Sequence, residues 1–367
     1  MRILYISGAF PPMKCGVGDY TALLIDKISS FTEVKTALIT NNIAQGINED
    51  YNFEIFPIVK NWNMLDVFNI QKTIKLWKPD LVHIQYPAKG YGRKIAVHFL
   101  PMILQLKKVP VVQTWHEPLR WKGCFRYLPN IFARGTLIVV EPNYIDLIPF
   151  WFQWIVKFKH LHFIPVASSI PFVSINMSEL TMLRSKFDGL THNIIAYFGF
   201  VSPAKGIEYI FQIANPEIDR IVLICELNPN NSYHKYILNI INQKPWAGKV
   251  FVTGFLNDKE VGGILSSVDA VVFPFVKGLS SRNTSFLAAK IQGSFILTTS
   301  KKQCGYNIEE NVYYSYPGDI TDMKKSLRLY SGKHILPQLD HSYNWDYIAD
   351  KHLSIYRNLL SNISNSE

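Results

Sequence analysis

Apolar residues along the chain follow two alternating patterns. Short runs rich in β-branched residues predict buried strands, which in the first half of the chain lie near residues 3–7, 34–40, 53–59, 81–86, 111–116, 136–140 and 160–165. Between these runs, apolar residues recur at helical spacing, most clearly over residues 65–77, and Pro79 follows that helix. Strands that alternate with helices are typical of a parallel sheet.

A second series of strands and helices follows a polar stretch after residue 175. Its strands are predicted near residues 194–199, 220–225, 249–254, 270–274 and 294–299, and its helices at about 206–214, 233–243, 257–268 and 283–292. Residues 343–360 predict a closing amphipathic helix with Asn344 as its cap.

These patterns predict an α/β protein with two Rossmann-like, doubly wound domains. We expect the first domain at residues 1–175, the second at 190–342, and a helix and tail at 343–367 that pack across them. Ligands of such sheets bind beyond the carboxyl ends of the strands, so the two domains are expected to face a central cleft. The length of 367 residues, with 48% hydrophobic residues, is sufficient for two cores.

The cysteines and the N-terminus bear on the compartment. Cys15, Cys124, Cys225 and Cys304 are far apart and form no cluster of the kind that binds zinc, which favours free thiols in a reducing compartment. No basic and then apolar leader precedes the first strand. We therefore expect a cytoplasmic protein without a metal site.

The net charge of +10 is concentrated in the first half of the chain. Up to residue 175 there are 19 basic and 11 acidic residues, and after it there are 19 and 17. A basic surface attracts the phosphates of nucleic acids, anionic lipids or lipid diphosphates. Composition alone does not choose among these partners.

The longest apolar stretch is an aromatic segment at residues 147–156 (LIPFWFQWIV). It is shorter than the roughly 18 residues that a membrane span needs. Because Lys157 and Lys159 lie beside it, the segment could lie on the inner surface of a membrane. The alternative is a buried helix of the first domain, because the segment is apolar on nearly every face.

Loops that follow predicted strands carry the candidate chemistry. The first contains Gly16, Val17, Gly18 and Asp19 at a helix start, where backbone amides can approach a phosphate closely. The dinucleotide fingerprint GxGxxG is absent, and glycines at such a turn are also compatible with a purely structural role.

Two further loops lie in the second domain. Gly199 and Phe200 lead to Lys205, whose charge can neutralise a diphosphate leaving group, although a solvated lysine would give the same pattern. The other loop brings hydroxyls, a guanidinium and backbone amides to one helix start: Ser280, Ser281, Arg282, Asn283, Thr284 and Ser285. Ser281 or Asn283 could serve only as a cap, but arginine at a helix start opposes the macrodipole and indicates another role.

The fourth loop follows a strand of the first domain. Its His116 could hydrogen-bond a sugar hydroxyl, transfer a proton or be structural. Polar and basic side chains suited to an acceptor follow strands of the same domain: Gln85, Tyr86, Lys89, Tyr91, Glu117 and Arg120.

Taken in order, these segments resemble family 4 of the retaining GT-B glycosyltransferases, especially members that build bacterial surface polysaccharides. The first half carries the motifs at residues 15–20 (CGVGDY), 79–86 (PDLVHIQY), 114–117 (TWHE) and 164–171 (IPVASSIP). The second half adds residues 198–200 (FGF), 205–206 (KG), 253–254 (TG), Asp269 with 273–274 (FP), and the closing helix from 345 to 356. The resemblance spans almost the whole chain.

The resemblance implies an enzyme that transfers a hexosyl or related unit, with retention, from a nucleotide sugar to a lipid-linked glycan, without a cofactor or an obligatory metal. The second domain would bind the donor and the first the acceptor. Lys205 would lie on the donor diphosphate, residues 16–18 near it, and His116 on the donor sugar. Positive charge and helix-terminal amides would stabilise the departing diphosphate.

Two positions depart from the family pattern. Relatives usually have an arginine after the glycine of the phosphate strand, where this chain has Phe200. Many also have two glutamates eight positions apart, and alignment on Gly293 puts Ser280 and Ala288 there. Neither residue can act as a carboxylate, so donor recognition is altered, and Arg282 could supply the cation that Phe200 does not.

Three other hypotheses stay open. A catalytically idle homologue that binds a nucleotide sugar, or supports a partner transferase, would explain the missing glutamates, although Lys205 and His116 argue against it. Nucleotide-sugar epimerases share the fold, but their usual catalytic carboxylates are not apparent. A nucleic-acid-binding module would fit the charge, but no motif for it is recognisable, and we expect no nucleic acid partner.

Overall fold

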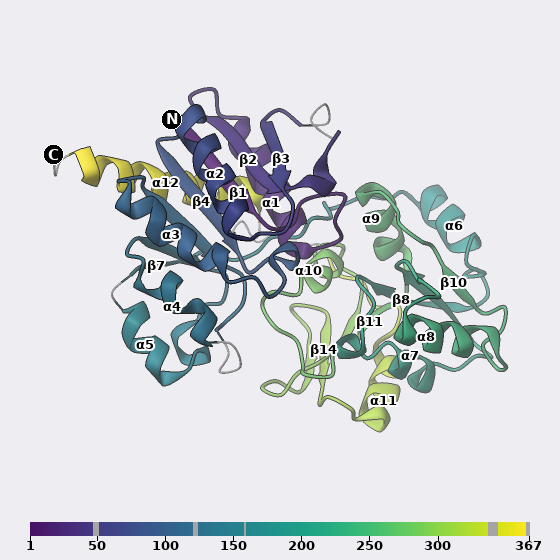
Figure 1. Ribbon diagram of the computed structural model, residues 1–367. Coiled ribbons are helices and arrows are strands. Elements are labelled where there is room, and N and C mark those ends of the chain that lie inside the picture. The colour runs from purple at the N-terminus through teal and green to yellow at the C-terminus, as the bar shows by residue number, and fades with distance from the viewer. Residues whose placement is uncertain (47–50, 120–123, 158, 337–343, 365–367) are drawn as a thin grey trace. The chain divides into compact units, whose positions relative to one another are not determined.

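The computed structural model describes residues 1–46, 51–119, 124–157, 159–336 and 344–364. The chain forms two compact units, Met1–Ala167 with His341–Glu367, and Ser168–Asp340 (Figure 1). Each unit has a sheet dominated by parallel strands with helices between them, so the predicted fold class is confirmed.

The sheet of the first unit has the strand order β3-β2-β1-β4-β5-β6-β7, and all its strands are parallel. Its strands are β1 (Arg2–Ser7), β2 (Lys35–Asn41), β3 (Glu54–Val59), β4 (Leu81–Tyr86), β5 (Val111–Trp115), β6 (Thr136–Val139) and β7 (His160–Phe163). Every strand predicted in this half is present. The order reverses between β1 and β4, where doubly wound sheets bind their ligands.

Helices connect these strands and bury one face against them. They are α1 (Gly16–Ser29), α2 (Met64–Trp77), α3 (Ala96–Leu106), α4 (Cys124–Phe132) and α5 (Phe150–Val156), with the short turns η1 (Asn42–Ala44), η3 (Lys89–Tyr91) and η4 (Ile145–Leu147). In α1, for example, Leu24, Ile25 and Ile28 are fully buried, which is the helical spacing that the sequence shows.

The C-terminal helix α12 (Trp345–Ser364) is part of the first unit, where it packs on α1. The predicted cap is present, because the Asn344 side chain accepts a hydrogen bond of 2.9 Å from the Asp346 amide. Ile348, Leu353 and Tyr356 are fully buried along one side of this helix. The end of the chain therefore completes the core that begins at β1.

The second unit has the strand order β10-β9-β8-β11-β12-β14-β13, with only β13 and β14 antiparallel among the described strands. Its strands are β8 (Asn193–Phe198), β9 (Asp219–Ile224), β10 (Val250–Val252), β11 (Ala270–Phe273), β12 (Ile296–Thr299), β13 (Gly305–Asn307) and β14 (Val312–Ser315). Its helices are α6 (Met177–Ser185), α7 (Glu208–Ile213), α8 (Ser232–Asn242), α9 (Asp258–Ser267), α10 (Thr284–Lys290) and α11 (Ile320–Tyr330), with the turn η5 (Pro203–Lys205).

The polar stretch after residue 175 contains a helix that the sequence did not predict, α6. The second unit begins at Ser168, and α6 packs on α9 within it. None of the residues of α6 is buried, so the helix lacks the apolar periodicity by which helices are predicted. A capping box formed by Asn176 and Glu179 starts it.

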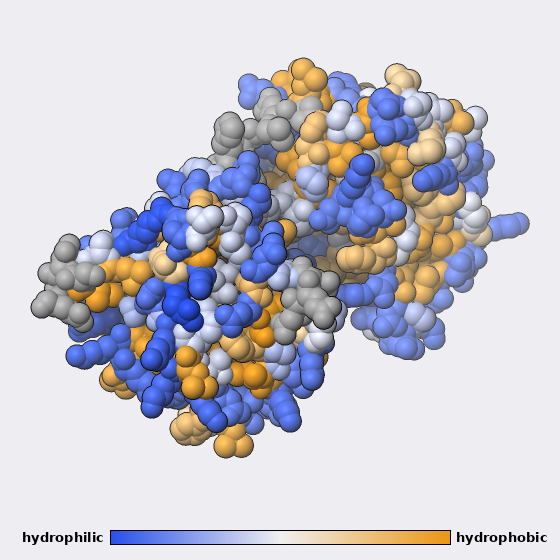
Figure 2. Space-filling view, turned by 90° about the horizontal axis from the view of Figure 1, so that it is seen from above, coloured by the Kyte–Doolittle hydropathy of each residue, from blue (hydrophilic) through white to orange (hydrophobic). Residues whose placement is uncertain are grey.

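The surface mixes polar and apolar residues. On the face shown in Figure 2, hydrophilic residues predominate and hydrophobic ones lie among them in small groups. Among the described residues, no helix is both long enough and apolar enough to cross a membrane.

Candidate functional site

In the first unit, the loops that follow β1 and β4 touch each other. A Cβ atom on Gly90 would lie 1.5 Å from the carbonyl oxygen of Gly8, and one on Gly8 would lie 2.5 Å from the ring of Tyr91. The Tyr91 hydroxyl donates to the carbonyl of Gln85 over 3.0 Å, and the Tyr86 and Tyr91 rings stack with centroids 5.7 Å apart. Tyr86 and Tyr91, predicted to bind an acceptor, are both buried.

The glycine loop leads into α1 as predicted. A Cβ on Gly18 would lie 3.2 Å from the backbone of Ala9, so packing restricts this position, whereas the space around Gly16 is open. Val17 is half-buried against the core, and the Asp19 amide donates to the Cys15 carbonyl over 3.0 Å. Of these two glycines, Gly16 is thus the one that a ligand can approach closely.

His116 directly follows β5 and is buried. Its backbone amide donates to the Tyr86 carbonyl, and its Nε2 hydrogen-bonds Oε1 of Gln85, both over 2.7 Å. The Tyr20 and His116 rings meet edge to face with centroids 4.8 Å apart. Gln85 therefore fixes the orientation of the His116 ring, a role that the sequence did not indicate.

A buried polar network lies behind this histidine, and the sequence analysis missed it. His83 on β4 hydrogen-bonds Thr114 on β5 over 2.8 Å and the Tyr356 hydroxyl on α12 over 2.5 Å. Tyr356 also hydrogen-bonds Tyr5 over 3.2 Å. Burial lowers the pKa of His83, and the neighbouring His352 and His116 lower it further. The network connects the C-terminal helix to the strands that carry Gln85 and His116.

Gln85 was also predicted to bind an acceptor, but it is fully buried. Two of the remaining predicted acceptor residues lie at the surface. Lys89 and Glu117 are exposed in the loops after β4 and β5. Arg120 lies outside the described residues.

In the second unit, the loop after β8 packs against the segment after β11. Gly206 has a φ of +65°, and a Cβ there would lie 2.4 Å from the Pro274 carbonyl oxygen. Gly199 has a φ of +129°, and its Cβ would lie 3.3 Å from the Cβ of Ser285. Both glycines are needed for backbone conformation and for close approach, so they place Lys205 beside the start of α10.

Lys205 and Arg282 form a concentration of positive charge at these strand ends. The Lys205 ammonium lies 4.7 Å from the centroid of the Phe275 ring. Burial lowers the pKa of Lys205, and the positive charge of Arg282 lowers it further. The Phe200 side chain is exposed, and its carbonyl accepts a hydrogen bond from the Tyr197 hydroxyl over 2.8 Å.

The segment before α10 has a different internal structure from the predicted caps. Asn283 occupies the cap position, but its side chain accepts from the amide and the hydroxyl of Ser280, at 2.8 and 3.1 Å, instead of capping the helix. Ser281 and Thr284 are exposed, and Ser285 packs beside Gly199.

Solved structures with the same architecture cover the whole chain. Sucrose-phosphate synthase from Thermosynechococcus elongatus superposes with a TM-score of 0.76 at 14% identity, over 99% of this chain and 100% of that one. A glycosyltransferase from Rickettsia africae gives 0.74 at 12% identity, over 98% and 99%. HepE from Anabaena, in complex with UDP-glucose, gives 0.68 at 14%, over 100% of each chain. No protein-family model and no curated protein sequence matches the chain.

The chain has the GT-B fold. Within it, Lys205 follows the first strand of the second unit and His116 follows a central strand of the first, so both lie at carboxyl strand ends. Among the described residues, no group of three or more histidine, cysteine, aspartate or glutamate side chains is placed to hold a metal ion. Cys15, Cys225 and Cys304 are free thiols.

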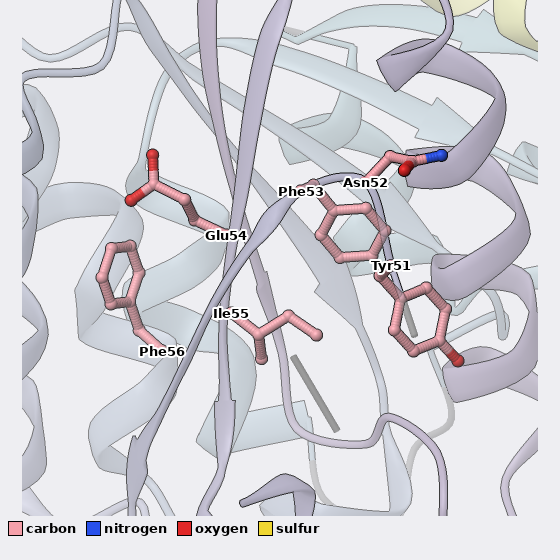
Figure 3. Close-up of a pocket in the computed structure, with 6 residues that line it drawn as sticks. All are labelled: Tyr51, Asn52, Phe53, Glu54, Ile55 and Phe56. Atoms are coloured by element: carbon pink, nitrogen blue, oxygen red, sulfur yellow. The ribbon is translucent and has the colours of Figure 1, made fainter. Parts of the chain in front are cut away.

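A separate groove of 490 Å³ follows the start of the edge strand β3 and is lined by residues 51–56. Figure 3 shows that Tyr51 and Phe53 extend to one side of this segment and that Glu54 and Phe56 lie on the other. None of the candidate residues of this GT-B chain lies in this groove.

Proposed function

We propose that this GT-B protein is a retaining glycosyltransferase, similar to family 4, that transfers a hexosyl or related unit from a nucleotide sugar to a lipid-linked glycan. Its place would be the biosynthesis of a cell-surface polysaccharide, in the cytoplasm at the inner face of the membrane. HepE, of the same fold, was solved with UDP-glucose, so UDP-glucose is the first donor to test.

The observation that carries the proposal is the pair of cations at the strand ends of the second unit. Burial lowers the pKa of Lys205, and the positive charge of Arg282 lowers it further. A bound diphosphate would attract both cations, which would offset the repulsion between them. As the bond from the sugar to the diphosphate breaks, negative charge grows on the leaving group, and the two cations stabilise it more strongly than they stabilise the intact donor.

Arg282 also offsets one departure from the family pattern. Phe200 stands where relatives carry an arginine, and its side chain is exposed and apolar. Arg282 lies near enough to Lys205 to lower its pKa, and it follows β11, the neighbouring strand of the sheet. We therefore assign to Arg282 the diphosphate contact that Phe200 cannot make.

One observation favours the idle homologue as a second candidate. Ala288, at the position of one missing glutamate, is fully buried in the core of the second unit. Ser280, at the other, is held in the turn by Asn283. A chain of this kind could bind a nucleotide sugar without transferring its sugar.

Release of nucleotide from a panel of nucleotide sugars, with membrane lipids as acceptor, tests the proposal. We expect release with at least one donor, and a large loss of release in Lys205→Ala, with the thermal unfolding temperature unchanged. Lys259→Ala, which removes an exposed lysine of the same unit, is the matched control. Wild-type release in Lys205→Ala would refute the role of Lys205, and binding without release would favour the idle homologue.

A further inference from the structure

Helix α5 of the first unit presents an aromatic face to solvent. Phe150, Trp151 and Trp154 are 76%, 66% and 66% exposed. Phe152 and Val156 of the same helix are buried in the core of the unit. The alternative of a buried helix therefore holds for one side of α5 only. The segment is apolar all round because one side packs in the core and the other faces outward.

The aromatic face extends onto neighbouring elements. Helix α5 contacts α4 and η4, and α4 and α5 lie together in Figure 1. Phe132 at the end of α4 is 67% exposed, and Leu147 at the end of η4 is 48% exposed. We call these five side chains the α5 face: Phe132, Leu147, Phe150, Trp151 and Trp154. Large apolar side chains that are exposed together on a surface mark a site of association.

The positive charge of the first unit lies in the same part of the chain. Residues 1–88 contain 8 basic and 8 acidic residues, whereas residues 89–160 contain 11 basic and 3 acidic ones. Arg134 follows α4, Lys157 follows α5, and both are exposed. Asp146 of η4 is the exposed acidic residue closest in sequence to the face. Exposed basic side chains therefore lie directly beside the aromatic ones in sequence, at Arg134 and Lys157.

We propose that the α5 face docks on the surface of an anionic lipid bilayer. Tryptophan and phenylalanine favour the boundary between headgroups and acyl chains, and basic residues beside them attract anionic headgroups. Helix α5 has seven residues and a length of about 10 Å, so it lies along this boundary and cannot cross the bilayer. The proposal concerns attachment and does not depend on the transfer reaction.

Co-sedimentation of the full chain with lipid vesicles tests this assignment. We expect wild-type protein to bind vesicles of phosphatidylcholine and phosphatidylglycerol, and to bind phosphatidylcholine alone much more weakly. The double variant Phe150→Ser with Trp151→Ser should partition at least tenfold less to the anionic vesicles. Phe68→Ser on α2 is the matched control, because Phe68 is 63% exposed and lies in residues 1–88, which carry no net charge. It should bind as wild type does.

Arg134→Glu with Lys157→Glu provides a second test that leaves the aromatic side chains in place. It should also lower binding to anionic vesicles, and added salt should lower wild-type binding. The proposal is overturned if wild-type protein ignores anionic vesicles, or if Phe68→Ser loses as much binding as the double variant. It is equally overturned if the double variant leaves vesicle binding intact and instead dissociates a dimer in sedimentation velocity, because the face would then bind a second copy.

Discussion

Lys205 illustrates how a single residue acquires its chemistry from its surroundings. Gly206 allows the chain to turn directly after it, and the Phe275 ring lies beneath its ammonium group. Burial and Arg282 both favour the neutral amine and lower its pKa. A bound diphosphate would favour the ammonium form instead, so binding of the donor and protonation of Lys205 are coupled.

We expect the affinity for a nucleoside diphosphate to fall as the pH rises through the pKa of Lys205. Lys205→Arg should show a weaker dependence on pH, because arginine keeps its charge throughout. Lys205→Ala should bind about tenfold more weakly or worse, since a hydrogen bond to a charged group contributes about 1.5–3 kcal/mol. Isothermal titration calorimetry at several pH values measures these affinities. The same pH dependence in Lys205→Arg as in wild type would contradict the account.

Gly90 gives a prediction about stability. A methyl group there meets the backbone of Gly8 and cannot be accommodated by moving a side chain. Gly90→Ala should therefore lower the free energy of unfolding by about 1–3 kcal/mol, as overpacking does. Gly16→Ala is the control, because the space around Gly16 is open. Urea unfolding followed by circular dichroism compares the two, and equal stability would show that the loops after β1 and β4 are not in contact.

Single residues could be predicted where local sequence decides their place. Lys205 and His116 each follow a recognisable strand, and the end of a strand is a local property. The contact of Gly8 with Gly90 and the hydrogen bond of His83 with Tyr356 join segments far apart in sequence, and no local pattern indicates them. Tyr91 was assigned to an acceptor for its polar hydroxyl, but its ring is buried.

At the scale of elements, α12 shows how the end of the chain supports the first unit. It begins at the Asn344 cap, and Lys27 of α1 forms an ion pair with Asp346 over 2.8 Å. That pair is exposed and contributes little. The buried contacts matter more, since Tyr356 hydrogen-bonds both Tyr5 and His83.

His352 on this helix predicts acid sensitivity. Burial lowers its pKa from 6.5 to about 4, so it is neutral in the folded chain while the unfolded chain takes up a proton. Stability should therefore be fully present above pH 6.5 and be lost as the pH falls toward 4, by roughly 3 kcal/mol from this group. Burial also lowers the pKa of His83, so protonation of His83 in the unfolded chain should add to this loss of stability at low pH. His352→Gln should show a smaller loss between pH 7 and 4.5 in urea unfolding. An unchanged loss would exclude His352 as a source of the acid sensitivity.

Elements were predictable in proportion to their apolar periodicity. The buried strands β1 and β4 and the helix α2 gave clear patterns, and all three are present. Strand β13 has only three residues, and α6 has no buried residues. Neither element therefore shows the repeating apolar pattern by which strands and helices are predicted. Helix α5 was ambiguous because its two faces are both apolar, and only its packing separates them.

At the scale of the whole molecule, the fold follows from the repeated alternation of strands and helices. The two sheets have the same strand order over their first five positions and differ only in the last two. Two similar series of apolar runs in the sequence give rise to them. Solved structures only 12–14% identical share this architecture, because the pattern of burial is retained while the residues change. Function depends on a few side chains, and the fold alone does not supply them.

The central claim is transfer of a sugar from a nucleotide donor. Its most direct test is to incubate the wild-type chain with radiolabelled nucleotide sugars, starting with UDP-glucose, and a bacterial membrane lipid extract, and to measure the label in the lipid fraction. The account predicts labelled lipid with matching release of nucleotide, both strongly reduced in Lys205→Ala. Donor binding with no labelled lipid and no nucleotide release for any sugar would contradict it.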